Sequence, residues 1–348
     1  MIKRNLLIQA IVIGICVACN PAIVTEREPT PAIENTLVAV VTQVIDATML
    51  EDDGTPVPTA TQFPTPTPAA TLDVSQGEIL MSVYPEGDIR WVNADGSNGQ
   101  ILLDEAIAFE LNDNRHATWL PDGSGISYTI DDFTQVEIWV MDNQGDNHQF
   151  LLGGVASNSS HCWSPDGKKV AYVSTQFKIQ IYDLVHQTLT PLTDGSLGME
   201  ENPDWSPDGS RIVFSAIEGG NQDIFIINTD GTGLDRVTNH LAIDASPDWS
   251  PDGMKIAFSS TRDGDRIEDI FVIDLSQGME EDGNNPIQLT FGDTFDIDPD
   301  WNPDGSIIVY ASLSQGAHHA TLFLVDANGI SRFQLTRENI YHSPQWRP

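Results

Sequence analysis

The sequence has few basic residues. Its 348 residues include 16 lysines and arginines against 51 aspartates and glutamates, a formal net charge of -35. A field of this sign repels phosphate backbones and anionic lipid surfaces, so we expect no nucleic-acid partner. The excess acid is consistent with a soluble, exposed surface, and equally with attraction for Ca²⁺ or a cationic partner.

Cysteine is also scarce, with three residues in the chain. Cys16 and Cys19 lie at the amino terminus, and Cys162 is the third. If the first 18 residues are removed and Cys19 is modified, no intramolecular disulfide can form. We therefore expect a fold held together by packing alone, with Cys162 as a small core residue.

The amino terminus has the features of an export signal. Lys3 and Arg4 precede an apolar stretch that ends at Ala18 and Cys19 and is too short for a settled transmembrane helix. Its end resembles a bacterial lipobox, although Cys16 stands where that family usually has leucine. The resemblance implies a signal peptide over 1–18, lipidation of Cys19 and attachment to a bacterial membrane, facing the periplasm or the cell exterior. Ordinary secretion is the alternative.

Residues 19–77 are expected to form a linker. Threonine and proline dominate residues 55–71, with proline at alternate positions in the run 63–68. Proline fixes φ and favours an extended, semi-rigid chain. The segment is therefore predicted to hold the following domain away from the membrane.

A five-residue motif, Trp-x-Pro-Asp-Gly, recurs through the rest of the chain. Successive copies start 42 to 52 residues apart, and a truncated copy ends the sequence. The tryptophans of the six copies are Trp119, Trp163, Trp205, Trp249, Trp301 and Trp346. A repeat of this length predicts an array of identical supersecondary units.

Each repeat predicts four strands. Pro-Asp-Gly is a turn sequence, and an alternating strand such as 255–259 follows it. A second strand such as 269–273 usually leads to an Asp-Gly or Asn-Gly hairpin turn, and a short Leu-Thr or Val-Thr strand follows. With the tryptophan segment as the fourth strand, each repeat has the pattern of a propeller blade.

The two ends of the array complete each other. Three strands over 79–83, 88–92 and 101–103 precede Trp119 without a tryptophan segment, whereas no strand follows Trp346. Pairing the carboxyl-terminal segment with these strands would remove two free sheet edges. We therefore predict an all-β, six-bladed propeller of four-stranded blades over 78–348.

These motifs resemble the TolB-type propeller repeats, relatives of the WD-repeat family. The resemblance covers residues 78–348, but the linker leaves no room for the amino-terminal α/β domain of TolB, so a Tol-Pal role is not implied. The repeat is also similar to propellers attached to prolyl oligopeptidase-type peptidases. The sequence contains no Gly-x-Ser-x-Gly nucleophile elbow, and we assign no catalytic residue.

Acidic residues precede the repeated tryptophan. Glu200, Asp244 and Asp296 lie five positions before it in consecutive repeats, and Asp298 lies nearby. If this segment is the innermost strand, as the resemblance implies, these carboxylates would face the axis and could bind Ca²⁺ or a cationic group. The alternative is that each carboxylate accepts backbone amides within its own blade.

The sequence favours an interaction protein. We expect a monomeric envelope lipoprotein whose propeller serves as a scaffold for another envelope or extracellular protein, or for a polysaccharide. The alternative is a divalent-metal-dependent hydrolase or lyase acting on a sugar or lactone at the axis. Propellers host both kinds of function, so the site must decide between them.

Overall fold

A computed structural model describes the chain over 74, 77–83, 88–103, 116–131, 135–156, 160–263, 267–277, 286–317, 320–336 and 341–348. All of these residues belong to one compact unit, 67–348. The predicted signal peptide, the lipidation site Cys19 and nearly all of the predicted linker lie outside the described residues.

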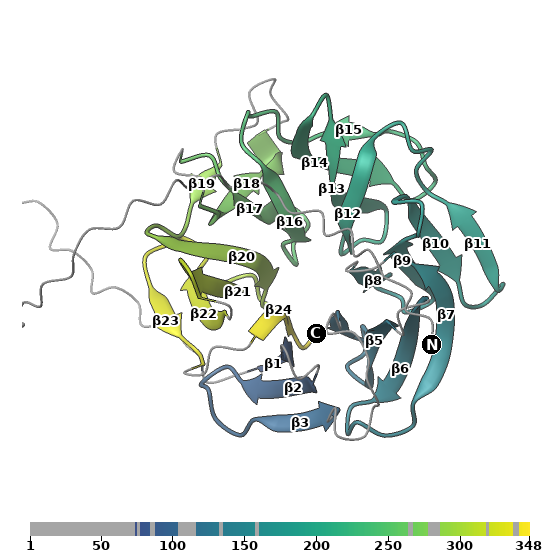
Figure 1. Cartoon of the computed structure of the whole chain (residues 1–348), viewed down its shortest axis with the longest axis horizontal. Helices are drawn as coiled ribbons and strands as arrows, with labels where there is room; N and C mark the ends of the chain where they lie inside the picture. Colours follow the sequence, from purple (N-terminus) through teal and green to yellow (C-terminus); the bar gives the residue numbers. More distant parts are fainter. Residues whose placement is uncertain are drawn as a thin grey trace, which may run out of the picture. The chain divides into compact units, whose positions relative to one another are not determined.

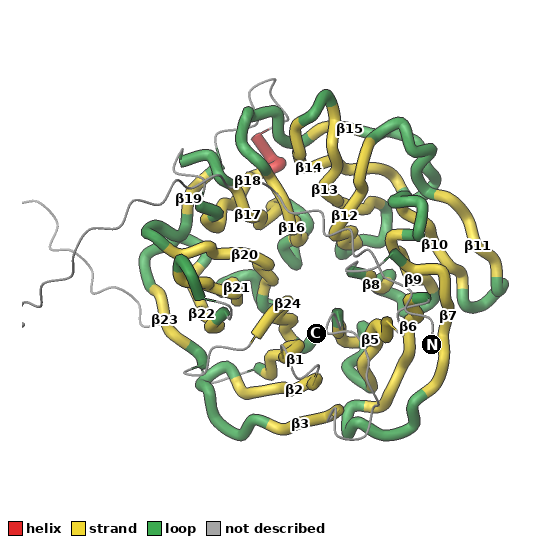
Figure 2. Tube along the Cα trace, viewed as in Figure 1, coloured by secondary structure: helices red, strands yellow, loops and turns green. Residues whose placement is uncertain are grey.

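The described chain is almost entirely β-structure and forms six four-stranded antiparallel sheets (Figures 1 and 2). From the axis outwards, blade 1 contains β24 (Tyr341–Trp346), β1 (Glu78–Val83), β2 (Asp88–Asn93) and β3 (Gln100–Leu103); blade 2 contains β4 (Ala117–Trp119), β5 (Gly125–Asp131), β6 (Val136–Asp142) and β7 (Gln149–Val155); blade 3 contains β8 (His161–Trp163), β9 (Lys169–Val173), β10 (Ile179–Asp183) and β11 (Thr188–Pro191). Blade 4 contains β12 (Gly198–Trp205), β13 (Arg211–Glu218), β14 (Asn221–Asn228) and β15 (Asp235–Arg236); blade 5 contains β16 (Asp244–Trp249), β17 (Lys255–Ser260), β18 (Asp269–Asp274) and β19 (Ile287–Gln288); blade 6 contains β20 (Thr294–Trp301), β21 (Ile307–Ser314), β22 (Thr321–Asp326) and β23 (Arg332–Gln334). A short 3-10 helix, η2 (Leu275–Gln277), follows β18. The described residues include no helix with the length and apolar character needed to cross a bilayer.

The predicted six-bladed propeller is confirmed, including its closure. β24 pairs antiparallel with β1, placing Trp346 opposite Ile79 and Gln345 opposite Leu80. In Figure 1 the tryptophan-bearing strands surround the axis, the outermost strands form the rim, and the carboxyl terminus lies near the centre. The last strand of the chain therefore supplies the inner strand of the first blade.

The turn of each motif has one repeated conformation. In blade 4 the Gly209 amide donates to the Ser206 carbonyl at 2.9 Å, and Gly209 has a φ of 73°. The Asp208 carboxylate accepts the Ser210 amide at 2.9 Å. Glycine is required here because the left-handed conformation is costly for a residue with a Cβ atom.

The repeated tryptophans fill the junctions between blades. Trp205, for example, packs with Phe214 of its own blade and with Ala171 and Ile179 of blade 3. The six apolar clusters of the described chain each lie between two adjacent blades and each contain or contact one tryptophan of the motif. The core is therefore divided into six similar junctions, which hold the inner strands in place around the axis.

Candidate functional site

A cavity of about 230 Å³ lies on the propeller axis. Its wall is built mainly from the inner strands, at positions one, two and three residues before the repeated tryptophan. The residues three positions before the tryptophan are His116, Ser160, Asn202, Ser246, Asp298 and Ser343. The lining residues one position before the tryptophan are Thr118, Cys162, Asp204, Asp248 and Gln345. Six equivalent strands thus present two rings of mostly polar side chains to one space.

A β-bulge in the inner strands shapes this wall. Between Glu201 and Asp204 of β12 the chain advances three residues, while its partner β13 advances two, from Ser215 to Val213. The same shift occurs in β16 and β20, and Asn202, Ser246 and Asp298 have φ values of 50°, 48° and 52°. One extra residue moves every preceding side chain to the opposite face of the strand.

The bulge determines where the predicted metal ligands lie. Of Glu200, Asp244, Asp296 and Asp298, only Asp298 lines the axial cavity. The other three are fully buried between neighbouring blades. The expectation that all four carboxylates face the axis is therefore corrected, because the bulge reverses the side of the strand on which the first three lie.

The three junction carboxylates each have local partners. Glu200 accepts the Ile179 amide at 2.8 Å and the Thr193 hydroxyl, both from the preceding blade. Asp296 accepts the hydroxyls of Ser312 and Thr294 at 2.5 and 3.0 Å. In the part of the chain that the structure describes, no three His, Cys, Asp or Glu side chains gather in an arrangement that could hold a metal ion.

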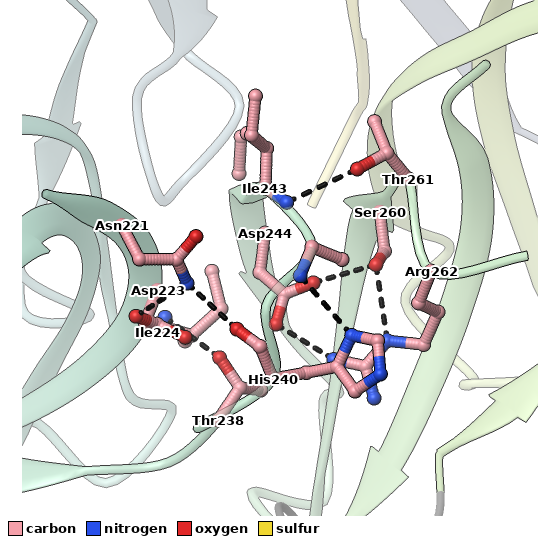
Figure 3. Close-up of polar contacts among 12 residues, drawn as sticks. Asn221, Asp223, Ile224, Thr238, His240, Ile243, Asp244, Ser260, Thr261 and Arg262 are labelled. Carbon is pink, nitrogen blue, oxygen red and sulfur yellow. Dashed lines mark hydrogen bonds and ion pairs between the residues drawn. The ribbon is translucent and has the colours of Figure 1, made fainter. Parts of the chain in front are cut away.

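Asp244 has the most complete set of partners (Figure 3). Its two oxygens accept the Ser260 hydroxyl at 2.5 Å and the Arg262 guanidinium at 2.6 Å. Arg262 also donates to Ser260 at 3.0 Å and lies over the Phe258 ring at 5.3 Å. Burial raises the pKa of Asp244, whereas the charge of Arg262 opposes that rise. These partners belong to blade 5, and a side-chain hydrogen bond with Thr238 of blade 4 links the carboxylate to the neighbouring blade.

A second set of aspartates links the blades at the axis. Asp204 accepts the backbone amide of Trp249 at 2.8 Å, and Asp248 accepts that of Trp301 at 2.8 Å. Asp300 accepts the amide of Trp346 at 2.7 Å. Each bond joins one inner strand to the next, so the aspartate immediately before the tryptophan has a repeated structural role in blades 4 to 6.

The environment of these aspartates favours their protonated forms. Burial raises the pKa of Asp204 to about 6. Hydrogen bonds from the Trp249 and Trp205 amides act in the opposite direction and limit this rise. Burial also raises the pKa of Asp248 well above its usual range, and the charges of Asp300 and Asp204 add to the rise. The members of this cluster therefore take up protons at a higher pH than ordinary aspartates do, and they titrate as an interacting group.

Blades 1 to 3 present a different side of the cavity. Gln345, Thr118 and Cys162 stand where the other blades have aspartate, and Thr118 donates to Gln345 at 3.2 Å. Burial raises the pKa of the Cys162 thiol, and the charges of Asp204 and Asp248 raise it further. The thiol is therefore neutral and unsuited to nucleophilic attack.

His161 lies beside Cys162 and is 4% exposed. Its Nε2 forms a hydrogen bond with Ser127 Oγ at 2.7 Å. The same Ser127 oxygen accepts a hydrogen bond from the Trp163 indole N–H at 2.8 Å. Burial lowers the pKa of His161 to about 3, with a further contribution from the charge of His116. Among the described residues, His161 Nδ1 and the nearby Ser160 Oγ are buried without a hydrogen-bond partner. The repeat pattern gave no indication of this polar pair, so it was not predicted from the sequence.

Exposed apolar side chains surround the end of the propeller at which the inner strands begin, which we call the entry face. They are Phe177, Met199, Leu241, Ile243 and Phe291, and Leu241 is 96% exposed. The Glu200 amide next to Met199 donates to the Phe177 carbonyl at 3.4 Å, and Thr261 donates to the Ile243 carbonyl at 3.1 Å. Loops of blades 3 to 6 and the start of β12 thus place these residues on one face. The residues are far apart in the sequence, so this grouping was not predicted.

Comparisons with known proteins agree with this architecture. Residues 131–348 match the TolB beta propeller domain family. An uncharacterized protein of Agrobacterium fabrum is 31% identical over 241 residues, 65% of this chain and 81% of the relative. The Tol-Pal system protein TolB of Anaeromyxobacter dehalogenans is 32% identical over 113 residues, 31% of this chain and 25% of TolB.

Among solved structures, TolB from Acinetobacter baumannii superposes with a TM-score of 0.65 and 21% sequence identity, covering 78% of this chain and 67% of that structure. At this identity the similarity concerns the fold. The predicted resemblance to TolB-type repeats is confirmed by these matches.

Proposed function

Because this chain belongs to the TolB β-propeller domain family, we propose that it is an exported envelope protein whose propeller serves as a docking scaffold for another protein. The observation that carries the proposal is the group of apolar side chains on the entry face. Leu241 and Phe291 are 96% and 64% exposed, and both lie in loops that lead into inner strands. Large apolar side chains gathered on one face are typical of a protein-binding surface.

The charge of the entry face indicates the kind of partner. Asp194, Glu218, Asp263 and Asp293 are exposed in its loops. Of these, Glu218 forms an ion pair with Arg236 at 3.2 Å. A partner that places apolar side chains against this face and basic side chains around them would match it in both respects. An anionic membrane surface would be repelled by the same charges.

The proposed location rests on the amino terminus and on the named relatives. The signal-like segment 1–18 and the predicted lipidation of Cys19 favour a membrane-attached protein, with the linker as a spacer. One relative is named as a component of the Tol-Pal system, but the match spans 25% of its length. The proposal therefore concerns an envelope scaffold and does not extend to that system.

The docking proposal can be tested by site-specific photo-crosslinking in intact cells. A crosslinking amino acid at Leu241, on the entry face, should give a discrete adduct. The matched control is Ile330, which is 73% exposed in the turn between β22 and β23 at the opposite end of the propeller. A Phe291→Asp substitution should remove the Leu241 adduct. Equal labelling from both positions, or an adduct that survives Phe291→Asp, would contradict the proposal.

The expectation of a metal-dependent hydrolase or lyase stays a prediction, as does Ca²⁺ binding. Asp298 is the one member of the predicted set that faces the cavity, and it accepts the Ser246 hydroxyl at 2.9 Å. A ligand that binds the folded state raises the unfolding midpoint. A midpoint that rises in millimolar Ca²⁺, returns with EDTA and loses this response in Asp298→Asn would support the metal prediction.

A further inference from the structure

The axial cavity has two chemically different sides. Blades 4 and 5 contribute the carboxyl groups of Asp204 and Asp248, whereas blade 3 contributes Ser160 and His161. No lysine or arginine is among the described residues that line it. The cavity therefore offers an acidic side without a cationic partner and, beside it, a neutral polar side.

The acidic side is suited to a donor that carries positive charge. Asp204 and Asp248 each use Oδ2 to accept a tryptophan amide, at 2.8 Å in both cases. Their carboxyl groups line the same cavity, and the charge of Asp204 raises the pKa of Asp248. Two neighbouring carboxylates disfavour each other's negative charge unless a proton or a cationic donor compensates it. An ammonium group supplies three N–H donors and one positive charge, so it can replace that proton.

The neutral side carries unused hydrogen-bonding capacity. Within the described chain, neither His161 Nδ1 nor Ser160 Oγ has a hydrogen-bond partner, although His161 is only 4% exposed. Ser127 Oγ accepts the Trp163 indole N–H, and its own hydrogen is then free to bond to His161 Nε2. In the tautomer in which Ser127 donates to Nε2, the imidazole hydrogen lies on Nδ1 and can serve as a donor. Buried donors are normally paired, so a ligand acceptor is expected here.

We infer that the axial cavity binds a primary ammonium group with a neighbouring carbonyl oxygen, the combination found at the amino terminus of a peptide. The ammonium group would lie between Asp204 and Asp248, and the carbonyl oxygen would accept from His161 Nδ1. A bare metal ion fits this site less well, since the described residues contain no cluster of three His, Cys, Asp or Glu side chains arranged to hold one. The inference concerns the cavity and does not depend on docking at the entry face.

Three small probes separate the two halves of the site. Glycinamide has both the ammonium group and the carbonyl, ethylamine has only the ammonium group, and N-acetylglycinamide has no charged amine. Calorimetric titration of the full chain at pH 7.5 should show binding of glycinamide and binding of ethylamine about tenfold weaker, since one hydrogen bond is lost. N-acetylglycinamide should not bind. Equal binding of all three probes, or no binding of glycinamide at millimolar concentration, would overturn the inference.

Variants assign the two halves to their residues. Asp248→Asn should weaken glycinamide binding at least tenfold, whereas Asp230→Asn, at an exposed turn, should leave it unchanged. His161→Phe should make glycinamide and ethylamine bind alike. Circular dichroism and the unfolding midpoint establish that each variant is folded. If Ca²⁺ binds at a site that Asp248→Asn abolishes while glycinamide does not bind, the cavity is an inorganic cation site and the inference is wrong. The crosslink from Leu241 should persist in Asp248→Asn, so failure here is distinguishable from failure of the docking proposal.

Discussion

Trp346 of β24 lies directly opposite Ile79 of β1 in an antiparallel pair. The next residue, Arg347, continues the contact, because its amide donates to the Glu78 carbonyl at 2.8 Å and its guanidinium donates to the Gly123 carbonyl at 2.9 Å. The end of the chain thereby joins its first described strand to the second blade. Closure of this kind pairs β1 on both sides, with β24 and with β2, so the first strand of the blade is not left as a free edge.

Trp346→Ala should destabilise the propeller by about 3–5 kcal/mol, because a buried indole is lost from the junction of blades 6 and 1 and a cavity remains. The free energy of unfolding can be measured by guanidinium denaturation. The matched control is Met254→Ala, at a side chain that is 57% exposed in the turn of blade 5. A loss for Trp346→Ala no larger than that of the control would show that the closing strand adds little.

Asp300→Ala should cost about 1–3 kcal/mol, because it leaves the buried Trp346 amide without its acceptor. Asp300→Asn keeps an acceptor oxygen in the same place and removes a carboxyl group whose ionised form is disfavoured by burial. We therefore expect the asparagine variant to be close to the parent protein in denaturation experiments. Equal losses in the two variants would show that the charge matters and the hydrogen bond does not.

The axial aspartates should add stability to the propeller as the pH falls from 7.5 to about 5, whereas His161, whose pKa burial lowers to about 3, should reduce stability over the same range. The pKa of Asp204 is about 6 in the folded state, above its ordinary value of 3.8, so the folded state binds protons that the unfolded state does not. This gain begins as the pH falls through 6 and is complete near 4. We expect about 1–3 kcal/mol, measured by denaturation at pH 7.5, 6 and 5.

The same titration has two internal checks. Asp248→Asn should reduce the pH dependence, although Asp269, whose pKa burial raises to about 7, contributes in the same direction. The Ser210 amide lowers the pKa of the turn residue Asp208 to about 2. The stability that such turn aspartates contribute to the fold is therefore lost only below about pH 4. His161 opposes the aspartates over this range, so the comparison between the parent and Asp248→Asn isolates the cluster. A pH dependence that is identical in the two proteins would contradict the assignment of protons to the axial cluster.

Arg262→Met should destabilise the protein by about 3–5 kcal/mol, because it leaves the fully buried Asp244 without its guanidinium partner. The double variant Asp244→Asn/Arg262→Met removes both charges and should recover much of the loss. A double-mutant cycle measured by denaturation gives the coupling between the two residues. Additive losses would show that the ion pair does not stabilise the junction.

Local sequence patterns were sufficient for the architecture. Pro-Asp-Gly turns, alternating strands and the regular tryptophan spacing depend on neighbouring residues, and they predicted six blades of four strands. The closure was also readable, because the strands before Trp119 lacked an inner strand and Trp346 lacked a blade. Short-range turn and strand chemistry, together with the number of repeats, is therefore sufficient to predict this fold.

The position of the carboxylates was decided by tertiary structure. Simple alternation from Asp204 would place Glu200 on the axis, but the bulge at Asn202 adds one residue and turns Glu200 into the blade junction. The spatial gathering of Asp204, Asp248, Ser160 and His161 likewise depends on how the blades close around one axis. The sequence by itself determined the repeat and the closed six-bladed propeller. Only the three-dimensional structure decided which side chains face the cavity, because a one-residue bulge does not change the spacing of the repeated tryptophans.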